Sequence, residues 1–144
     1  MSIRLQMTLV ETHICQLKRR FRTCGAGAAG LCQYCNRLFC DDHGVVQDDR
    51  QEICTRRFCQ DKRRDLIRHL EYKEAVESRN ERRLCGIESC SRILGGRCAR
   101  CDGYFCGRHV EPREEMYLQN RVRMRRMASL CHHCWARRPI WVRT

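Results

Sequence analysis

The chain is poor in the large apolar side chains from which small domains usually build a core. Its 144 residues include only four phenylalanines, four tyrosines and two tryptophans, whereas 32% of them are charged. The mean hydropathy is −0.64. Because so little apolar surface does not offset the conformational entropy lost on folding, we expect metal ions or disulfides to hold the fold. At this length the chain has room for one ordinary domain or two very small ones.

Segments for membrane insertion and for secretion are missing as well. No run of about eighteen apolar residues is present, so we expect no membrane-spanning helix and no membrane partner. The segment 1–16, MSIRLQMTLVETHICQ, lacks the apolar core and the small-residue cleavage site of a secretory signal. We therefore expect a reducing, cytoplasmic location, where cysteine patterns indicate metal binding or redox chemistry more often than disulfides.

Motifs typical of enzymes are also absent. The sequence contains no HExxH motif and no nucleophile motif, and the glycine-rich segment 25–30 lacks the Lys-Ser/Thr of a phosphate-binding loop. The CxxC pairs lack the βαβ context of a thioredoxin-like redox site. We expect a protein without catalytic activity and without a small-molecule substrate.

What the sequence has in excess is cysteine, and the cysteine spacing occurs twice. A run of four cysteines and one histidine recurs with the same intervals, displaced by 66 positions: Cys24, Cys32, Cys35, Cys40, His43 and Cys90, Cys98, Cys101, Cys106, His109. Phe39 and Phe105 correspond within CQYCNRLFCDDH and CARCDGYFCGRH, and so do Gly30 and Gly96. Two such runs in register indicate an internal duplication.

Each half contains three further cysteines beside this run. They are Cys15, Cys54 and Cys59 in the first half, and Cys85, Cys131 and Cys134 in the second. Each half therefore holds seven cysteines and one histidine, which is enough for two four-coordinate sites with no cysteine left over. A closed tetrahedral set of sulfur and imidazole donors is typical of structural zinc, whereas disulfides do not account for the repeated histidine. The sequence predicts four structural Zn²⁺ ions per chain.

One ligand position in the first half has two candidate residues. The gap between Cys15 and Cys24 is longer than the gap between Cys85 and Cys90. His13 is therefore an alternative to Cys15 at this position.

The CxxCxxxFCxxH core, with one cysteine pair before it and one after it, resembles cross-braced treble-clef fingers. The likeness is greatest to the AN-one finger and, with cysteine in place of the histidine, to the FYVE finger. It implies that neighbouring ligand pairs alternate between two ions. The four implied ligand sets are Cys15, Cys24, Cys40, His43; Cys32, Cys35, Cys54, Cys59; Cys85, Cys90, Cys106, His109; and Cys98, Cys101, Cys131, Cys134.

The resemblance also implies the fold. We expect a small metal-stabilised α+β protein with two tandem treble-clef-like zinc modules, each made of a knuckle, a β-hairpin and a helix. The paired histidines with which FYVE fingers bind phosphoinositide have no counterpart in AAGLC or LGGRC. Lipid binding is therefore not implied.

The chain pattern suggests three parts. The segment VVQDDRQEIC after His43 predicts a β-hairpin, and the segment 55–84, which has no glycine or proline, predicts a helix that starts near Cys59. The stretch ESRNERR is almost wholly charged, which favours an exposed linker helix. We expect a first double-zinc module over 1–62, a charged helical linker over 63–82 and a second double-zinc module over 83–144.

The segment between His109 and Cys131 allows two interpretations. Pro112 is able to open a short helix through EEMYL. Alternatively, YLQNRVRMRRMASL forms a hairpin that turns at Gln119 and Asn120. In the tail we expect Trp135 and Trp141 to pack against the second module.

The charge of the chain predicts a polyanionic partner. There are 29 Lys and Arg residues against 17 Asp and Glu, so the formal net charge is +12, and 26 of the 29 cations are arginine. The planar guanidinium binds phosphate and stacks on bases, which suits nucleic acid. A GC-rich genome produces the same preference for arginine, but it does not account for the net charge.

The arginines cluster beside the expected zinc ligands. The candidate nucleic-acid contacts are Arg19, Arg20, Arg22, Arg56, Arg57, Arg63, Arg64, Arg121, Arg123, Arg125, Arg126, Arg137 and Arg138. Candidates for stacking on unpaired bases are Phe21, Tyr34, Tyr104, Tyr117 and Trp141.

Two functions follow as hypotheses. The first is binding of structured RNA, for example as a small component of a ribosome or another ribonucleoprotein. The alternative is a protein-interaction adaptor or scaffold subunit of a larger complex, docking through the helix around Leu66 to Val76.

Overall fold

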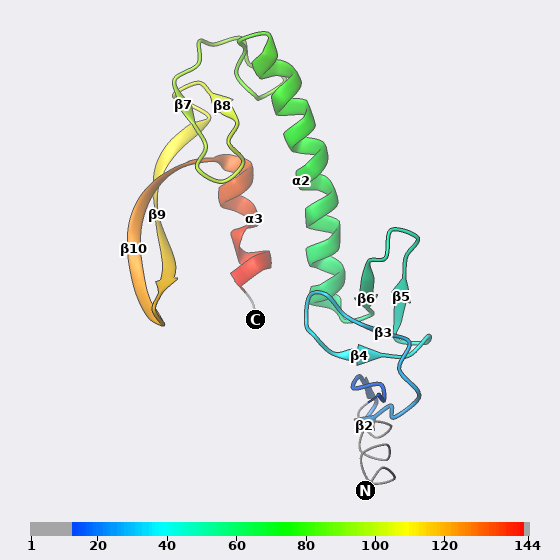
Figure 1. Ribbon diagram of the computed structural model, residues 1–144. Helices are drawn as coiled ribbons and strands as arrows, with labels where there is room; N and C mark the ends of the chain where they lie inside the picture. Colours follow the sequence, from blue (N-terminus) through cyan, green and yellow to red (C-terminus); the bar gives the residue numbers. More distant parts are fainter. Residues whose placement is uncertain (1–12, 143–144) are drawn as a thin grey trace, which may run out of the picture. The chain divides into compact units, whose positions relative to one another are not determined.

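The structure is a computed structural model that describes residues 13–142 (Figure 1). The segment 1–12, which carries most of the region analysed for a secretory signal, lies outside the described residues. The chain forms two compact units, Met1–Arg64 and Asp65–Thr144. Within residues 13–142 the structure is a small α+β fold with two helices and antiparallel hairpins, which confirms the predicted class.

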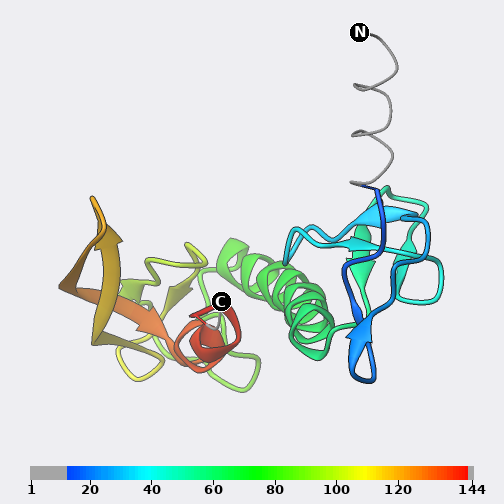
Figure 2. The same ribbon diagram turned by 90° about the horizontal axis from the view of Figure 1, so that it is seen from below.

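The first unit is built from short antiparallel hairpins followed by the start of a helix (Figure 2). Strand β1 pairs with β2, β3 with β4, and β5 with β6. The β5–β6 pair is the hairpin predicted after His43. The bounds are β1 Lys18–Arg19, β2 Arg22–Thr23, β3 Gly30–Leu31, β4 Leu38–Phe39, β5 Gly44–Val46, β6 Glu52–Cys54 and α2 Arg57–Glu81.

Phe39 is the largest side chain in the core of the first unit, and it is completely buried. Its ring lies directly against the backbone of Gly30 and Gly44. A Cβ atom added at Gly44 would lie 2.2 Å from Phe39 Cδ2, so any larger residue at this position displaces the ring. The core is otherwise made mainly of Leu17, Ile53 and the cysteines.

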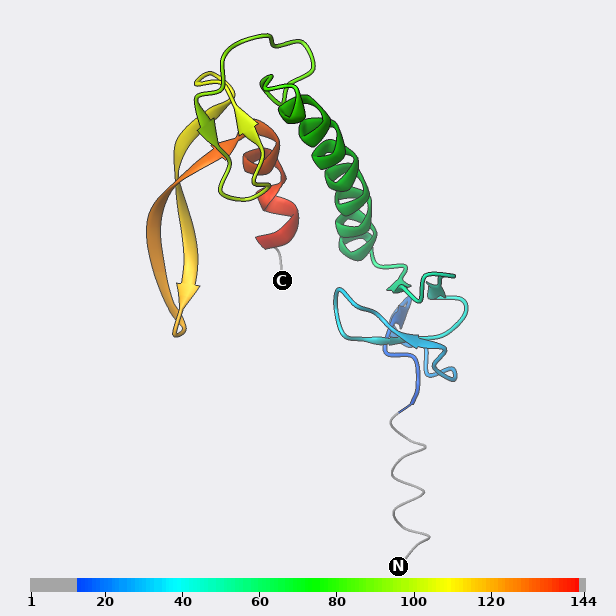
Figure 3. The same ribbon diagram turned by 45° about the horizontal axis from the view of Figure 1, so that its top comes forward.

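The second unit contains most of α2, two further strand pairs and a C-terminal helix. The longest element pair is the β9–β10 ribbon, drawn from yellow to orange in Figure 3. The bounds are β7 Gly96–Arg97, β8 Tyr104–Phe105, β9 Val110–Gln119, β10 Val122–Cys131 and α3 His132–Val142.

The β9–β10 ribbon decides between the two interpretations of this segment. Pro112 lies inside β9 and pairs with Ser129, so it does not open a helix. Gln119 pairs with Val122, and the turn residues Asn120 and Arg121 have φ angles of 51° and 66°. Two consecutive left-handed residues are the signature of a tight type I′ hairpin turn, one position later than expected.

The two cysteine runs that match in the sequence also have matching local structure. Asn36 and Asp102, each just after a CxxC pair, both adopt left-handed φ angles, 54° and 62°. Short polar residues tolerate this conformation best. In addition, the backbone N–H groups of Ala29 and Gly95 donate hydrogen bonds to the carbonyl oxygens of Phe39 and Phe105, in both cases at 2.7 Å.

The unequal cysteine gap of the first half also has a structural cause. Gln16, after Cys15, donates its N–H to Leu38 O, and Gly86, after Cys85, donates to the equivalent Tyr104 O. Cys15 and Cys85 therefore occupy equivalent positions. The extra residues of the first copy form the β1–β2 hairpin.

The segment predicted as a charged linker makes specific contacts with the second unit. Val76 is buried in its core. Arg79 donates hydrogen bonds to the carbonyl oxygens of Cys85 and Cys90, at 2.8 and 2.5 Å. The Asn80 side chain bonds to both the N–H and the carbonyl of Tyr104. Helix α2 beyond Arg64 is thus part of the second unit, while the division into three parts stays a prediction.

Among the described residues, no helix combines the length and the apolar character that crossing a bilayer requires.

Candidate metal centres

The cysteines and two histidines gather into four groups, two in each unit. Within each group the potential ligand atoms all lie within 4.8 Å of one another. The groups contain the same residues as the four ligand sets implied by the resemblance, with Cys15 rather than His13 in the first. They are Cys15, Cys24, Cys40, His43; Cys32, Cys35, Cys54, Cys59; Cys85, Cys90, Cys106, His109; and Cys98, Cys101, Cys131, Cys134.

The distances within the groups match the edges of a tetrahedron around one zinc ion. With Zn–S bonds of about 2.3 Å, tetrahedral geometry places two sulfurs roughly 3.8 Å apart. The Sγ–Sγ distances are 3.9 Å for Cys24 and Cys40, and 3.8 Å for the equivalent Cys90 and Cys106. All fourteen cysteines are free, and a disulfide would require a sulfur separation of about 2.05 Å. These spacings favour a shared cation over cross-links.

The two histidines face their cysteines in the same way. His43 Nδ1 lies 3.3 Å from Cys40 Sγ and 3.5 Å from Cys15 Sγ. His109 Nδ1 lies 3.3 Å from Cys106 Sγ and 3.4 Å from Cys85 Sγ. In both units, then, Nδ1 is the ring nitrogen available to the metal, and Nε2 points away from the sulfurs.

The fold supplies the last ligand pair of each unit at a strand–helix junction. Cys54 ends β6 and Cys131 ends β10, whereas Cys59 and Cys134 lie in the first turns of α2 and α3. Helix N-termini favour thiolates because unpaired N–H groups point toward them. Neither helix has an acidic residue in its first turn that would oppose this effect.

Hydrogen-bond donors surround the sulfurs of the second unit. The N–H groups of Cys106 and Cys131 donate to Cys85 Sγ and Cys98 Sγ, both at 3.3 Å. A side chain contributes as well, since the Tyr72 hydroxyl lies 3.4 Å from Cys131 Sγ and donates to it. Such donors stabilise thiolates and orient metal ligands. The sequence analysis missed Tyr72, although its spacing from Val76 on one helix face was a usable signal.

The thiols of the fourth group perturb one another's ionisation. Hydrogen bonds from Cys101, Cys131 and Cys134 lower the pKa of Cys98. Within the same group, hydrogen bonding to the other thiols and burial raise the pKa of Cys134. When one of four buried thiols in contact ionises, its negative charge disfavours ionisation of the others. A divalent cation among them would stabilise the thiolates together.

The structure separates the candidate arginines into two classes. In the first, the guanidinium already has an internal partner: Arg137 binds Asp65, Arg126 binds Glu115, Arg125 binds Glu114, Arg63 binds Gln47, Arg64 binds Asp61, Arg56 stacks on Phe58 and Arg138 stacks on Trp135. In the second class, the side chains are exposed and form no ion pair within residues 13–142: Arg19, Arg20, Arg22, Arg57, Arg121 and Arg123.

The candidate stacking aromatics differ in the same way. Phe21 is fully exposed at the end of β1–β2. Trp141 donates its indole N–H to Asp65 and packs within the second unit, as expected for the tail. Arg126 lies 4.9 Å over the Tyr117 ring, while Tyr34 packs against the core of the first unit. Tyr104 remains largely exposed.

Comparisons with protein-family models, with curated proteins and with solved structures give no significant match. The class of protein is therefore defined by the four Cys/His clusters, which suggest zinc-finger-like modules and a zinc-binding protein. The particular likeness to AN-one and FYVE fingers stays an interpretation of the ligand spacing.

Proposed function

We propose that one Zn²⁺ ion occupies each of the four clusters and that the protein is a non-catalytic, cytoplasmic zinc protein. Each unit then forms a cross-braced treble-clef module, because knuckle, hairpin and first helical turn all contribute ligands. The donor sets support structural zinc, since four protein ligands leave no position for a substrate or water. Within this proposal the metal holds hairpins that the small core alone does not fix.

We further propose that these hairpins bind structured RNA, with a ribosome or another ribonucleoprotein as the setting. The observation that carries this proposal is the exposure of arginines without acidic partners on two hairpins. Arg121 and Arg123 lie at the end of the β9–β10 ribbon, and Arg19, Arg20 and Arg22 lie on β1–β2. A ten-residue ribbon is about 33 Å long, which is enough to follow an RNA backbone over several phosphates.

The experiment is a salt titration of RNA binding. Fluorescence anisotropy of a labelled RNA stem-loop is measured with zinc-loaded full-length protein between low and moderate salt. Affinity should fall steeply with salt, and Arg121→Gln with Arg123→Gln should weaken binding and reduce the salt slope by about two. Arg92→Gln with Arg108→Gln removes the same charge from exposed positions elsewhere in the second unit and serves as the control. No RNA binding at low salt would overturn the proposal.

A second candidate, the protein-interaction adaptor, is supported by apolar side chains on one face of the same ribbon. Met116, Leu118 and Met127 share this face by their register and are all exposed. The helix around Leu66 to Val76 offers less than expected, because Val76 is buried and only Ile67 and Leu70 remain as exposed large apolar residues. Salt-resistant binding to one protein, lost when Leu118 and Met127 become glutamine, would favour the adaptor over RNA binding.

A further inference from the structure

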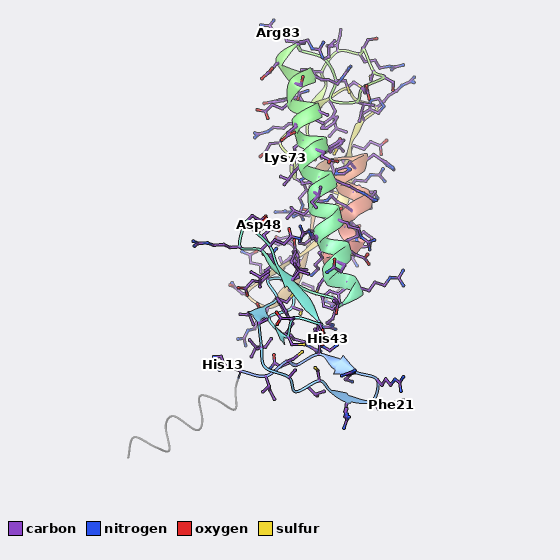
Figure 4. All side chains as sticks on the ribbon, turned by 90° about the vertical axis from the view of Figure 1, so that its right-hand side faces the viewer. His13, Phe21, His43, Asp48, Lys73 and Arg83 are labelled. Atoms are coloured by element: carbon purple, nitrogen blue, oxygen red, sulfur yellow. The ribbon has the colours of Figure 1, made fainter. Side chains whose placement is uncertain are left out.

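The β1–β2 hairpin carries two features that its own folding does not require. Phe21, with a relative exposure of 102%, contributes nothing to the core, and Figure 4 shows it at the end of the hairpin. Arg20 beside it has a φ angle of 58°, where glycine or asparagine is the common choice. An exposed aromatic side chain beside an exposed arginine at the tip of the hairpin is available for contact with a partner.

A cationic groove of about 440 Å³ lies at the base of this hairpin. Three of the lining residues are cations, Lys18, Arg37 and Arg56, and none is acidic. Arg56 is held in place by stacking on the Phe58 ring, 4.3 Å away, which leaves its charge unneutralised. The groove is also lined by Leu17, by Thr55 with its hydroxyl group, and by His43, whose Nε2 points away from the cluster sulfurs.

Lys18 belongs to both the groove and the hairpin, so the two features are continuous. Because the chain reverses between Arg20 and Phe21, the tip of the hairpin lies roughly 7 Å beyond Lys18, at about 3.3 Å per residue. A phosphate held at Lys18 and a base held at Phe21 are then close enough to belong to the same or to neighbouring nucleotides. The groove offers charge and hydrogen-bond donors for a phosphodiester, and the tip offers an aromatic face for a base.

We propose that the β1–β2 hairpin and this groove form a binding site for unpaired nucleotides of RNA. The phosphate lies between Lys18, Arg37 and Arg56, and the base stacks on Phe21 while the flanking arginines contact neighbouring phosphates. The inference rests on the proposed RNA-binding function and specifies that the first unit binds unpaired nucleotides of the RNA. Aromatic and guanidinium planes together are the usual partners of unpaired bases.

An anionic membrane surface is the alternative partner for the β1–β2 hairpin, because exposed arginines beside an aromatic side chain also bind anionic lipids. The hairpin favours RNA, because membrane insertion scales with buried apolar area and Phe21 is the only apolar side chain at the tip. The groove at its base selects a compact anion through several donors, which suits a phosphodiester between nucleosides.

The test compares two RNAs that share one stem, a blunt duplex and the same duplex with a single-stranded uridine overhang. Full-length zinc-loaded protein is titrated into each labelled RNA. Phe21→Ala should weaken binding of the overhang RNA about tenfold or more and leave the blunt duplex unchanged, whereas Phe21→Trp should retain binding. Lys18→Gln and Arg37→Gln should each lower the salt slope for the overhang RNA by about one. Ile93→Ala, which removes another side chain with 90% relative exposure, is the matched control.

The outcomes separate this inference from the broader proposal. If wild type binds RNA but Phe21→Ala binds both RNAs as tightly as wild type, the nucleotide site is overturned and RNA binding stands. If wild type binds neither RNA, both proposals fall. Binding to phosphatidylserine vesicles that is lost in Phe21→Ala would then assign the hairpin to membranes. Equal zinc content of all variants, measured by mass spectrometry, excludes unfolding as the cause.

Discussion

Asp65 and Arg137, which are 72 positions apart in the chain, form a largely buried ion pair in the second unit. Arg137 donates from Nε at 3.0 Å and from Nη2 at 2.6 Å to one carboxylate oxygen, which also accepts the indole N–H of Trp141. Burial alone would raise the pKa of Asp65, but these hydrogen bonds and the guanidinium charge hold it below its usual value. The cluster joins the N-terminal part of this unit to α3.

Asp65→Ala should therefore destabilise the second unit strongly. Removal of the carboxylate leaves the mostly buried Arg137 without a partner, which costs about 3 kcal/mol or more of unfolding free energy. Asp61→Ala breaks the exposed pair with Arg64 and should cost less than about 1 kcal/mol. Guanidinium denaturation of the zinc-loaded variants measures both values. Equal losses for the two variants would mean that the buried pair does not hold α3.

The metal content is the second prediction. Protein purified under reducing conditions should contain four zinc ions per chain by mass spectrometry, in line with the four clusters. Chelation should abolish the far-UV spectrum of folded protein, because the metal–ligand bonds that hold the hairpins are lost and the small apolar core alone does not replace them. Two ions per chain would mean that one unit does not bind metal, and none would exclude zinc as the stabilising element.

The alternation of ligand pairs is a separate prediction. After replacement of zinc by cadmium-113, correlation with cysteine β-protons assigns each cysteine to its own ion. Cys98 and Cys101 should share their ion with Cys131 and Cys134, and Cys106 should share its ion with Cys85 and Cys90. A spectrum in which Cys101 and Cys106 share one ion would contradict cross-bracing.

Tyr72→Phe tests the hydrogen bond to a cluster sulfur. Burial and the Cys131 sulfur raise the pKa of Tyr72, so its hydroxyl stays protonated and donates. Loss of such a donor typically lowers metal affinity about tenfold or more, while the ring and its packing remain. Competition with a chromophoric chelator should show one weaker zinc site out of four. Tyr104→Phe, at an exposed hydroxyl in the same unit, should leave all four sites unchanged.

Gly44→Ala tests the close approach of Phe39 to the backbone. The new methyl group would overlap the Phe39 ring, so the first unit should lose about 1 to 3 kcal/mol of stability. Gly27→Ala is the control, since an added Cβ there meets no atom within 4 Å. Thermal unfolding of both variants provides the comparison. Equal stability would mean that the ring moves aside without strain.

The sequence was most informative where metal chemistry dictates spacing. Tetrahedral zinc takes four donors, so seven cysteines and one histidine in each half predicted two sites per half. Which ligands share an ion was implied by the resemblance to cross-braced fingers. The choice between Cys15 and His13 was beyond the sequence, because the β1–β2 insertion hides the equivalence of Cys15 and Cys85. That equivalence becomes visible only in the hydrogen bonds to Leu38 and Tyr104.

Long-range packing was the part that the sequence did not predict. The charged composition of α2 pointed to an exposed linker, yet Arg79 and Asn80 bind backbone groups of the second unit. The sequence does not distinguish a polar side chain that donates a hydrogen bond to a backbone carbonyl from one that faces water. Between His109 and Cys131 the sequence allowed either a helix opened by Pro112 or a hairpin, and the pairing of β9 with β10 shows the hairpin.

Helix α2 has consequences for the inheritance of the duplicated halves. Its first turn carries Cys59, a member of the second cluster, and farther along it carries Asp65 and Val76, which the second unit buries. If the chain is divided before Cys59, the first copy loses a member of its second cluster. If it is divided after Asp65, the second copy loses a buried ion-pair partner of Arg137. Only a break between Cys59 and Asp65, at the boundary of the two units, leaves each copy complete. Recombination that exchanges or loses one copy is therefore confined to a short stretch of this helix.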